Sequence, residues 1–368
     1  MKNTFIFCCL LTIIPFINAQ EYNYQNLSIG FKAKNTDFYQ FEKLRLYPIY
    51  ANNSFLKHSE NMGKYIPLQK ALTDKKIIIA EINAIEDSTT SQRRTTTQRQ
   101  RIIRNRRNGQ NINQNNNNQQ NINRNNTLAP IERNEEVNTL SVQNISKDTI
   151  YIMAGEIIQG GKQDRVIAKD IVLPPMTQPI ELPVFCVEQG RWEYDQKNPK
   201  ENKKFQKYYG TASLKLRSKV EKEVNQQSVW SEITRSNNEN NTKTETQAYT
   251  AQIKTQDFQQ NHQKYVDYFK NILPKDKKII GVVVVTGNQV VGCDMFASPQ
   301  LFQSQFESLL TSYVNEAMTD GHNITIEPEI VKNYVDNLLS DTEKQKSFIE
   351  KKGKKIKHKE INLRFSTF

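Results

Sequence analysis

Short segments of alternating hydrophobic and polar positions recur along the chain, as is typical of strands with one buried face. Residues 41–46 (FEKLRL) alternate in this way. Residues 76–82 (KIIIAEI) contain an apolar run that predicts a buried strand. Residues 137–142 and 149–153 are predicted to pair as a hairpin across the turn at 144–148. Further strands are expected at residues 165–173, 180–187 and 361–365.

Helical patterns dominate the second half of the chain. Residues 201–271 are polar and helical in pattern, with one long amphipathic stretch at 214–233. Residues 279–285 and 289–296 predict a β-hairpin with a Gly-Asn turn. Apolar residues at helical spacing follow Pro299, and further short helices are expected at residues 68–72 and 329–339.

This order of elements indicates the fold class. Strands come first, helices follow, and one strand-like segment ends the chain, an order that predicts an α+β domain. We expect a largely antiparallel sheet with helices packed on it, and a C-terminal β-hairpin followed by a helix.

The composition changes abruptly within this domain. Residues 87–126 are mostly Thr, Gln, Arg and Asn, too polar to offset the entropy of ordering. The predicted organisation is a signal peptide (1–20), the first part of the domain (21–86), a disordered Asn/Gln/Arg-rich insert (87–135), the main part (136–320) and a C-terminal helix, Lys-rich segment and final strand (321–368).

The formal net charge of +12 is concentrated in two segments. Eight arginines and no acidic residue lie between Arg93 and Arg124, and six lysines lie between Lys351 and Lys359. Together these segments carry a charge of +14, so the rest of the chain is near −2. The insert could therefore make weak nonspecific contact with anions or nucleic acid, although a solvated linker explains it equally well.

The N-terminus has the pattern of a secretory signal. Lys2 precedes a short apolar run at residues 5–14, too short to anchor the chain in a bilayer, and Ala19 supplies the small residue that a cleavage site needs. We expect a secreted or periplasmic protein without a transmembrane segment after cleavage. The remaining cysteines, Cys186 and Cys293, could form a disulfide or be buried thiols.

The segment GEIIQGGK, which starts at Gly155, does not match a phosphate-binding loop. Glu156 replaces the required first glycine, Gln163 follows the lysine where Ser or Thr is needed, and a strand rather than a helix is predicted to follow. Gly160 and Gly161 still indicate unusual backbone angles or a close backbone approach.

Polar residues at this loop and at the end of the strand at 180–187 are the best candidates for chemistry. If the two segments meet, Glu156, Asp164 and Glu188 could act as acid and base, with arginines nearby. The same set could equally be a structural ion network. The candidate ligand-binding residues are Lys162, Gln163, Asp164, Arg165, Glu188, Arg191 and Trp192. The chain has no zinc-ligand spacing, no Cys-His pairing and no Gly-x-Ser-x-Gly motif. The sequence leaves any cofactor unknown.

These motifs resemble those of a known family. Ala154-Gly155-Glu156, GGKQDR from Gly160 and PVFCVEQGRW from Pro183 are similar to the signature of the ARPP-type domain, which abbreviates "ARG and rhodanese-phosphatase-superfamily-associated protein" domain. The family is functionally uncharacterised. Its name implies an association with ADP-ribosylglycohydrolases and phosphatase-like proteins, and hence a nucleotide or ADP-ribose context. The resemblance also makes a disulfide between Cys186 and Cys293 less expected.

Three functions follow as hypotheses. The first is an exported protein that binds a small anionic or sugar-like ligand at the Glu/Asp/Arg cluster. The second is a hydrolase acting on a nucleotide-like or ADP-ribose-like substrate. The third is a structural or surface-interaction protein without a small-molecule site.

Overall fold

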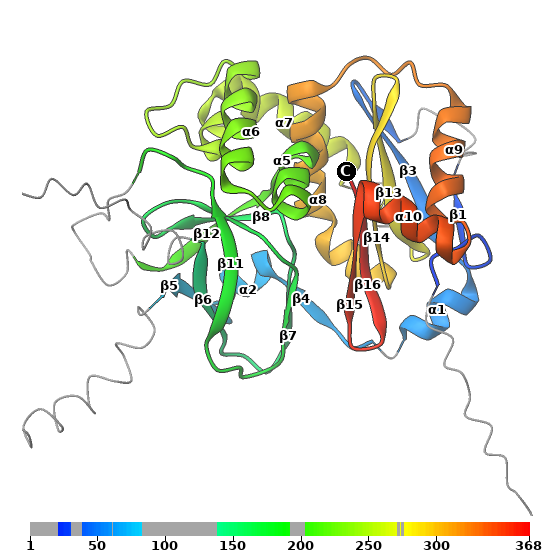
Figure 1. Cartoon of the computed structure of the whole chain (residues 1–368), viewed down its shortest axis with the longest axis horizontal. Helices are drawn as coiled ribbons and strands as arrows, with labels where there is room; N and C mark the ends of the chain where they lie inside the picture. Colours follow the sequence, from blue (N-terminus) through cyan, green and yellow to red (C-terminus); the bar gives the residue numbers. More distant parts are fainter. Residues whose placement is uncertain are drawn as a thin grey trace, which may run out of the picture.

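The computed structural model describes residues 21–30, 39–60, 62–82, 138–191, 203–270, 273 and 276–368. The chain has the expected α+β fold, and its sheets are largely antiparallel (Figure 1). The predicted signal peptide, the predicted insert and Trp192 lie outside the described residues.

A seven-stranded sheet forms one half of the described structure. Its order is β1-β3-β13-β14-β16-β15, with β2 pairing to β3. The strands are β1 (Leu27–Ile29), β2 (Gln40–Phe41), β3 (Leu44–Ala51), β13 (Ile279–Thr286), β14 (Gln289–Phe296), β15 (Gly353–His358) and β16 (Ile361–Thr367). Val282 and Val284 of β13 pack in one hydrophobic cluster, and Val283 and Val285 pack in another. The sheet is therefore covered on both faces, which explains the unbroken apolar run in β13.

Two smaller sheets form the other half of the described structure. The six-stranded one has the order β12-β8-β9-β11-β6-β5, and an isolated bridge from Ala80 to Lys204 brings its two outer strands together. Its strands are β5 (Ile77–Glu81), β6 (Thr139–Asn144), β8 (Glu156–Gly160), β9 (Arg165–Ile167), β11 (Ile180–Cys186) and β12 (Phe205–Thr211). The three-stranded sheet contains β4 (Tyr65–Pro67), β7 (Thr149–Ile152) and β10 (Ile171–Leu173). Only β4 and β7 pair in parallel among the described strands.

Helix α8 (Pro299–Asp320) lies between the two halves (Figure 1). It contacts β13 and β14 on one side and β12 and β4 on the other. The remaining helical elements are α1 (Asn53–Ser59), α2 (Leu68–Thr73), α5 (Leu214–Ser218), the π-helix η2 (Lys219–Glu223), α6 (Gln226–Glu239), the 3₁₀-helix η3 (Tyr249–Lys254), α7 (Gln256–Phe269), α9 (Pro328–Leu338) and α10 (Thr342–Lys352). No helix in the described part of the chain is long and apolar enough to span a membrane.

The predicted hairpin and the helix after it are confirmed. β13 and β14 pair in antiparallel fashion around Gly287, whose φ of 59° lies in the left-handed region. Ser298 then caps α8 by accepting a hydrogen bond from the Leu301 amide, and Pro299 occupies the first turn. A proline at this position needs no amide partner.

Three local predictions were wrong. β6 pairs with β5 and β11 rather than with β7, because a long-range partner replaces the local one. Residues 165–173 form two strands in different sheets, since the chain turns between Ile167 and Ile171. The expected helical region contains β12, and the amphipathic stretch after it is interrupted by η2 and by Val224 in the left-handed conformation.

Candidate functional site

The double glycine lies in the turn between β8 and β9, directly against the start of β12. A Cβ on Gly161, whose φ is +54°, would lie 2.5 Å from Phe205 Cζ and 2.7 Å from Glu81 Oε1. Gly160 has a φ of +142° and is crowded by the Lys204 carbonyl. The glycines therefore allow close packing of backbone on backbone, and a strand follows them instead of a phosphate-binding helix.

Asp164 closes this turn and is bound from several sides. Its Oδ2 accepts hydrogen bonds from Gln159 Nε2 at 2.9 Å and from Thr250 Oγ1 at 2.9 Å. Its Oδ1 accepts one from Arg191 Nη2 at 3.1 Å and a longer one from the Gly160 amide at 3.4 Å. Burial raises the pKa of Asp164, opposed by its hydrogen bond from Gln159, while the Glu188 carboxylate raises it further.

Arg191 joins Asp164 to Glu188 across the end of β11. Its Nε donates to Glu188 Oε2 at 2.8 Å, and its Nη1 donates to the Gly161 carbonyl at 3.0 Å. Glu188 Oε2 also accepts a hydrogen bond from the Asp164 amide at 3.3 Å. The Arg191 side chain is 33 % exposed, whereas those of Asp164 and Glu188 are 6 % and 8 % exposed. The arginine is thus the solvent-facing member of this group.

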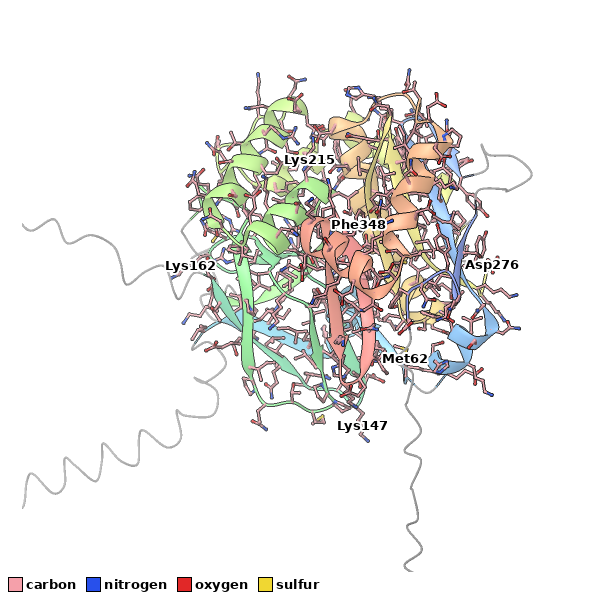
Figure 2. The ribbon with its side chains drawn as sticks, turned by 45° about the vertical axis from the view of Figure 1, so that its right-hand side comes forward. Met62, Lys147, Lys162, Lys215, Asp276 and Phe348 are labelled. Atoms are coloured by element: carbon pink, nitrogen blue, oxygen red, sulfur yellow. The ribbon has the colours of Figure 1, made fainter. Side chains whose placement is uncertain are left out.

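Arg165 belongs to the same turn but points elsewhere. Its Nη1 donates to the Gln163 carbonyl at 3.0 Å, and its Nη2 lies 3.9 Å from Glu81 Oε1. Arg165 is 1 % exposed, and its Nε has no hydrogen-bond partner among the described residues. Gln163 is fully buried, while Lys162 is half-buried and lies at the outer edge of the molecule (Figure 2). We call Lys162, Gln163, Asp164, Arg165, Glu188 and Arg191 the turn cluster.

Glu156 does not join the turn cluster. It is fully buried, its Oε2 accepts the Met153 amide at 2.7 Å, and its Oε1 accepts the Tyr208 hydroxyl at 2.8 Å. Burial raises the pKa of Glu156 to about 8, against the lowering effect of those two hydrogen bonds. The sequence-based grouping of three carboxylates is thus divided. Asp164 and Glu188 share Arg191, whereas Glu156 faces the centre of the molecule.

Cys186 lies beside the turn cluster as a free, buried thiol. The amide and carbonyl of Cys186 bond to the side chain of Gln226, each at 2.9 Å. Burial raises the pKa of Cys186 to about 11. The thiol is therefore protonated at neutral pH, whereas nucleophilic attack requires the thiolate. Cys293 is also free and buried, so the structure contains no disulfide between them. In the described ranges, no group of three or more His, Cys, Asp or Glu is arranged to hold a metal ion.

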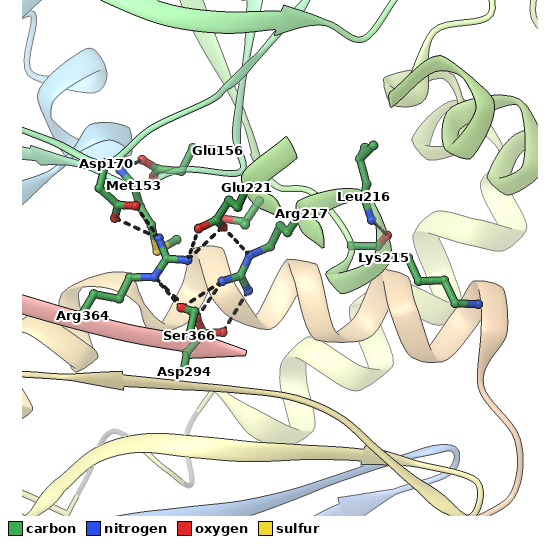
Figure 3. A network of polar contacts seen from close by, with 12 residues as sticks. Met153, Glu156, Asp170, Lys215, Leu216, Arg217, Glu221, Asp294, Arg364 and Ser366 are labelled. Atoms are coloured by element: carbon green, nitrogen blue, oxygen red, sulfur yellow. Dashed lines mark hydrogen bonds and ion pairs between the residues drawn. The ribbon is translucent and has the colours of Figure 1, made fainter. Parts of the chain in front are cut away.

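A second polar cluster, not predicted from the sequence, lies between the two halves (Figure 3). We call Asp170, Arg217, Glu221, Asp294, Arg364 and Ser366 the buried ion network. Arg217 Nη1 and Nη2 donate to Asp294 Oδ2 and Oδ1 at 2.9 Å and 2.7 Å. The side chains of both residues are fully shielded from solvent.

Arg364 connects the rest of the buried ion network. Its Nη1 donates to Asp170 Oδ1 at 2.8 Å, and its Nη2 donates to Glu221 Oε1 at 3.0 Å. Its Nε donates to Ser366 Oγ at 2.6 Å, and Ser366 in turn donates to Asp294. Burial alone would raise the pKa of Asp294, but Arg217 and then Arg364 outweigh it, so the pKa lies below its usual value. The carboxylate is therefore ionised and paired.

The buried ion network accounts for part of the sequence signature. Gly155 has a φ of +87°, and a Cβ there would lie 2.7 Å from Arg217 Cγ. Glu221 is supplied by η2, one of the π-helical turns that often occur at functional or strained sites. A usable sequence signal existed for Asp294, which is a charge inside a largely apolar strand, because such residues are seldom fully buried without a partner. Arg364 gave no such signal, since β16 alternates polar and apolar residues.

The two clusters differ in what they can do. The buried ion network has every charge paired and is closed to solvent, as expected of a group that holds the two halves together. In the turn cluster, the carboxylates of Asp164 and Glu188 lie just beneath the surface, and the Arg191 side chain that binds both of them reaches solvent. Only the turn cluster can contact a ligand without opening the fold.

One of the comparisons with known proteins identifies a family. The model of the ARPP-1 family, the ARG and Rhodanese-Phosphatase-superfamily-associated Protein domain, matches residues 32–362. The chain therefore belongs to this family, as its motifs predicted. No curated protein and no solved structure matches the chain.

Proposed function

We propose that this member of the ARPP-1 family binds a small sugar-like or anionic ligand at the turn cluster. The observation that carries the proposal is the position of Arg191. It bridges Asp164 and Glu188 while a third of its side chain stays exposed. A ligand that displaces the Arg191 guanidinium, or binds beside it, would contact both carboxylates and the exposed side of the turn between β8 and β9.

The balance of charge favours a hydroxyl-bearing ligand over a bare anion. Arg191 already has two carboxylate partners, so a free anion gains little attraction there. Ionised carboxylates are strong acceptors for hydroxyl groups, and charge-assisted hydrogen bonds are stronger than neutral ones. A ribose or another sugar-like group fits this acceptor-rich cluster.

A hydrolase acting on a nucleotide-like or ADP-ribose-like substrate is the second candidate. One observation favours it: burial raises the pKa of Asp164, the direction that a general acid requires. Glu188, next to it and bound to the same arginine, would then be the second carboxylate. The alternative is that the turn cluster only stabilises the turn. The experiment must distinguish this structural role from ligand binding and from hydrolysis.

Isothermal titration calorimetry on the intact protein, with ADP-ribose, ribose and inorganic phosphate as separate probes, tests the proposal. We expect saturable binding of ADP-ribose and ribose, and weaker or no binding of phosphate. Chromatography of the ADP-ribose sample after incubation would reveal any hydrolysis product and favour the second candidate. No heat with any of the three probes would support the structural reading.

We also propose that the protein is exported, on the basis of the N-terminal pattern that includes Lys2 and Ala19. Expression of the full chain in a Gram-negative host, followed by fractionation and N-terminal sequencing, tests this. A processed chain in the periplasm or medium that begins at Gln20 or Glu21 is expected. An unprocessed chain in the cytoplasm would contradict the proposal.

A further inference from the structure

The six lysines near the C-terminus form a surface of defined structure rather than a tail. Lys351 and Lys352 end α10, and Lys354, Lys355 and Lys357 follow along β15. Lys359 completes the series in the turn that leads to β16. All six are exposed, and β15 is the last strand in its sheet. We call these six residues the lysine edge.

Like charges lie close together on this surface. Burial and then the charge of Lys354 lower the pKa of Lys222, which reaches the same surface from η2. Burial and then Lys357 lower the pKa of Lys355, and only Glu21 opposes them. Only two acidic residues, Glu350 and Glu360, flank this run of lysines in the sequence. A bound polyanion would relieve this repulsion.

The shape of the lysine edge is linear. A strand rises about 3.3 Å per residue, so side chains on the same face are about 6.6 Å apart. Lys355 and Lys357 alternate onto one face of β15 and Lys354 lies on the other, so the charges project from both sides of the sheet edge. The pairing of β15 with β16 shifts register between Ile356 and Lys357, so this spacing is approximate there. An extended chain of phosphodiesters presents its charges in such a row, whereas a single small anion would engage only one or two lysines.

Two aromatic rings lie at the end of the same strand. His358 and Tyr65 form an edge-to-face pair with ring centroids 6.4 Å apart. Both residues are half-buried, so part of each surface faces solvent. Proteins that bind single-stranded nucleic acid combine a basic track along the backbone with aromatic rings that stack on the bases.

We propose that the lysine edge, together with the His358–Tyr65 pair, is a docking surface for single-stranded nucleic acid. The lysines contact successive phosphates along β15, and the rings contact a base at its end. This interaction is independent of the small-ligand site at the turn cluster.

Fluorescence anisotropy with a labelled 20-nucleotide oligothymidylate, titrated with the full chain over a series of salt concentrations, tests the proposal. The variant carries Lys354→Ala, Lys355→Ala and Lys357→Ala. The control carries Lys243→Ala, Lys254→Ala and Lys264→Ala, which removes the same charge from exposed positions in the helical part of the other half. Because each phosphate contact contributes about 0.7 to the slope of log affinity against log salt, the variant should lose about 2 from that slope.

His358→Ala, measured at pH 8, separates stacking from charge. It should weaken binding about fivefold or more without changing the salt slope. An equal loss in the variant and the control, or no loss in either, would overturn the proposal, because binding would then come from total charge or from the arginines between Arg93 and Arg124. Binding to phosphatidylglycerol vesicles without binding to the oligonucleotide would also overturn it. So would self-association of the variant with unchanged affinity, since the lysines would then serve only to protect a sheet edge.

Discussion

Arg217 and Asp294 form a two-pronged ion pair in the centre of the protein, with donor–acceptor distances of 2.9 Å and 2.7 Å. Tyr313 donates a further hydrogen bond to Asp294 at 2.8 Å. The residues come from α5, β14 and α8, so this pair ties α5 to the seven-stranded sheet across α8. Its integrity should therefore determine how stable the whole fold is.

Asp294→Asn should destabilise the protein by about 3–5 kcal/mol, because it replaces the charged two-pronged acceptor of the fully buried Arg217 guanidinium by a neutral amide with only one acceptor atom. Urea denaturation followed by circular dichroism measures this loss. Lys219→Ala is the control, since it removes only the exposed pair with Glu223 and should cost about 0–1 kcal/mol. Equal losses in the two variants would show that the central pair has no special role.

Gly155→Ala should cost more than Gly63→Ala. Both glycines have positive φ, of 87° and 79°, so both substitutions impose left-handed strain of about 1 kcal/mol. Only Gly155 is crowded, because its new Cβ would lie 2.7 Å from Arg217 Cγ, whereas nothing lies within 4 Å of the position at Gly63. Each substitution lowers the free energy of unfolding, which urea denaturation measures. The difference between the two losses isolates the contact with Arg217. A zero difference would mean that the buried ion network can shift freely.

Glu156 should make stability depend on pH. Burial raises its pKa in the folded protein to about 8, above the ordinary value of 4.5. Between these values the folded state holds a proton that the unfolded chain has lost, so the free energy of unfolding falls as pH rises, on the order of 5 kcal/mol in total. Burial also raises the pKa of Glu316, to about 7, so this residue adds to the same trend.

Glu156→Gln isolates the contribution of Glu156. The amide oxygen can keep the hydrogen bond from the Met153 amide. The Tyr208 hydroxyl, which donates to Glu156 Oε1, can donate to Ser308 Oγ instead and accept from the new amide group. Urea denaturation from pH 5 to pH 9 should show a shallower decline in the variant than in the unmodified protein. Parallel curves would mean that Glu156 is ionised in the folded state.

Cys186 and Cys293 should react with a thiol reagent only after unfolding. Both are free and fully buried. Mass spectrometry after iodoacetamide treatment should find both unlabelled in the native protein and both labelled in guanidinium. A disulfide-linked peptide containing both residues would contradict the structure.

The fold class was predictable because its signals are local. The apolar run of β13, the Gly287 turn and the capped start of α8 each follow from neighbouring residues. Strand partners were not predictable from local pattern, as β6 and β7 show, because the pairing is set by residues far away in the chain. The lysine-rich segment was expected to precede the last strand but forms β15 itself, since an edge strand tolerates lysines on both faces.

The candidate site was predictable only in part. Asp164 lies 24 residues before Glu188 and 27 residues before Arg191, and the turn and the strand end that carry them meet as predicted. Glu156 is eight residues from Asp164, but the two ends of β8 face different surroundings, so the sequence distance misled the grouping. The buried ion network draws on Asp170, Arg217 and Arg364, which are far apart in sequence, and no local motif connects them.

The most direct test of the central claim compares Arg191 with Arg235. Arg235 bridges Glu232 and Asp320 with 34 % of its side chain exposed, which closely matches Arg191 between Glu188 and Asp164. The measurement is the rise in melting temperature that saturating ADP-ribose causes in the unmodified protein, in Arg191→Ala and in Arg235→Ala. If the turn cluster is a binding site, both variants should lose about 1 kcal/mol of stability, but only Arg191→Ala should lose the ligand-induced rise. An unchanged rise in Arg191→Ala, or the same loss in both variants, would contradict the account.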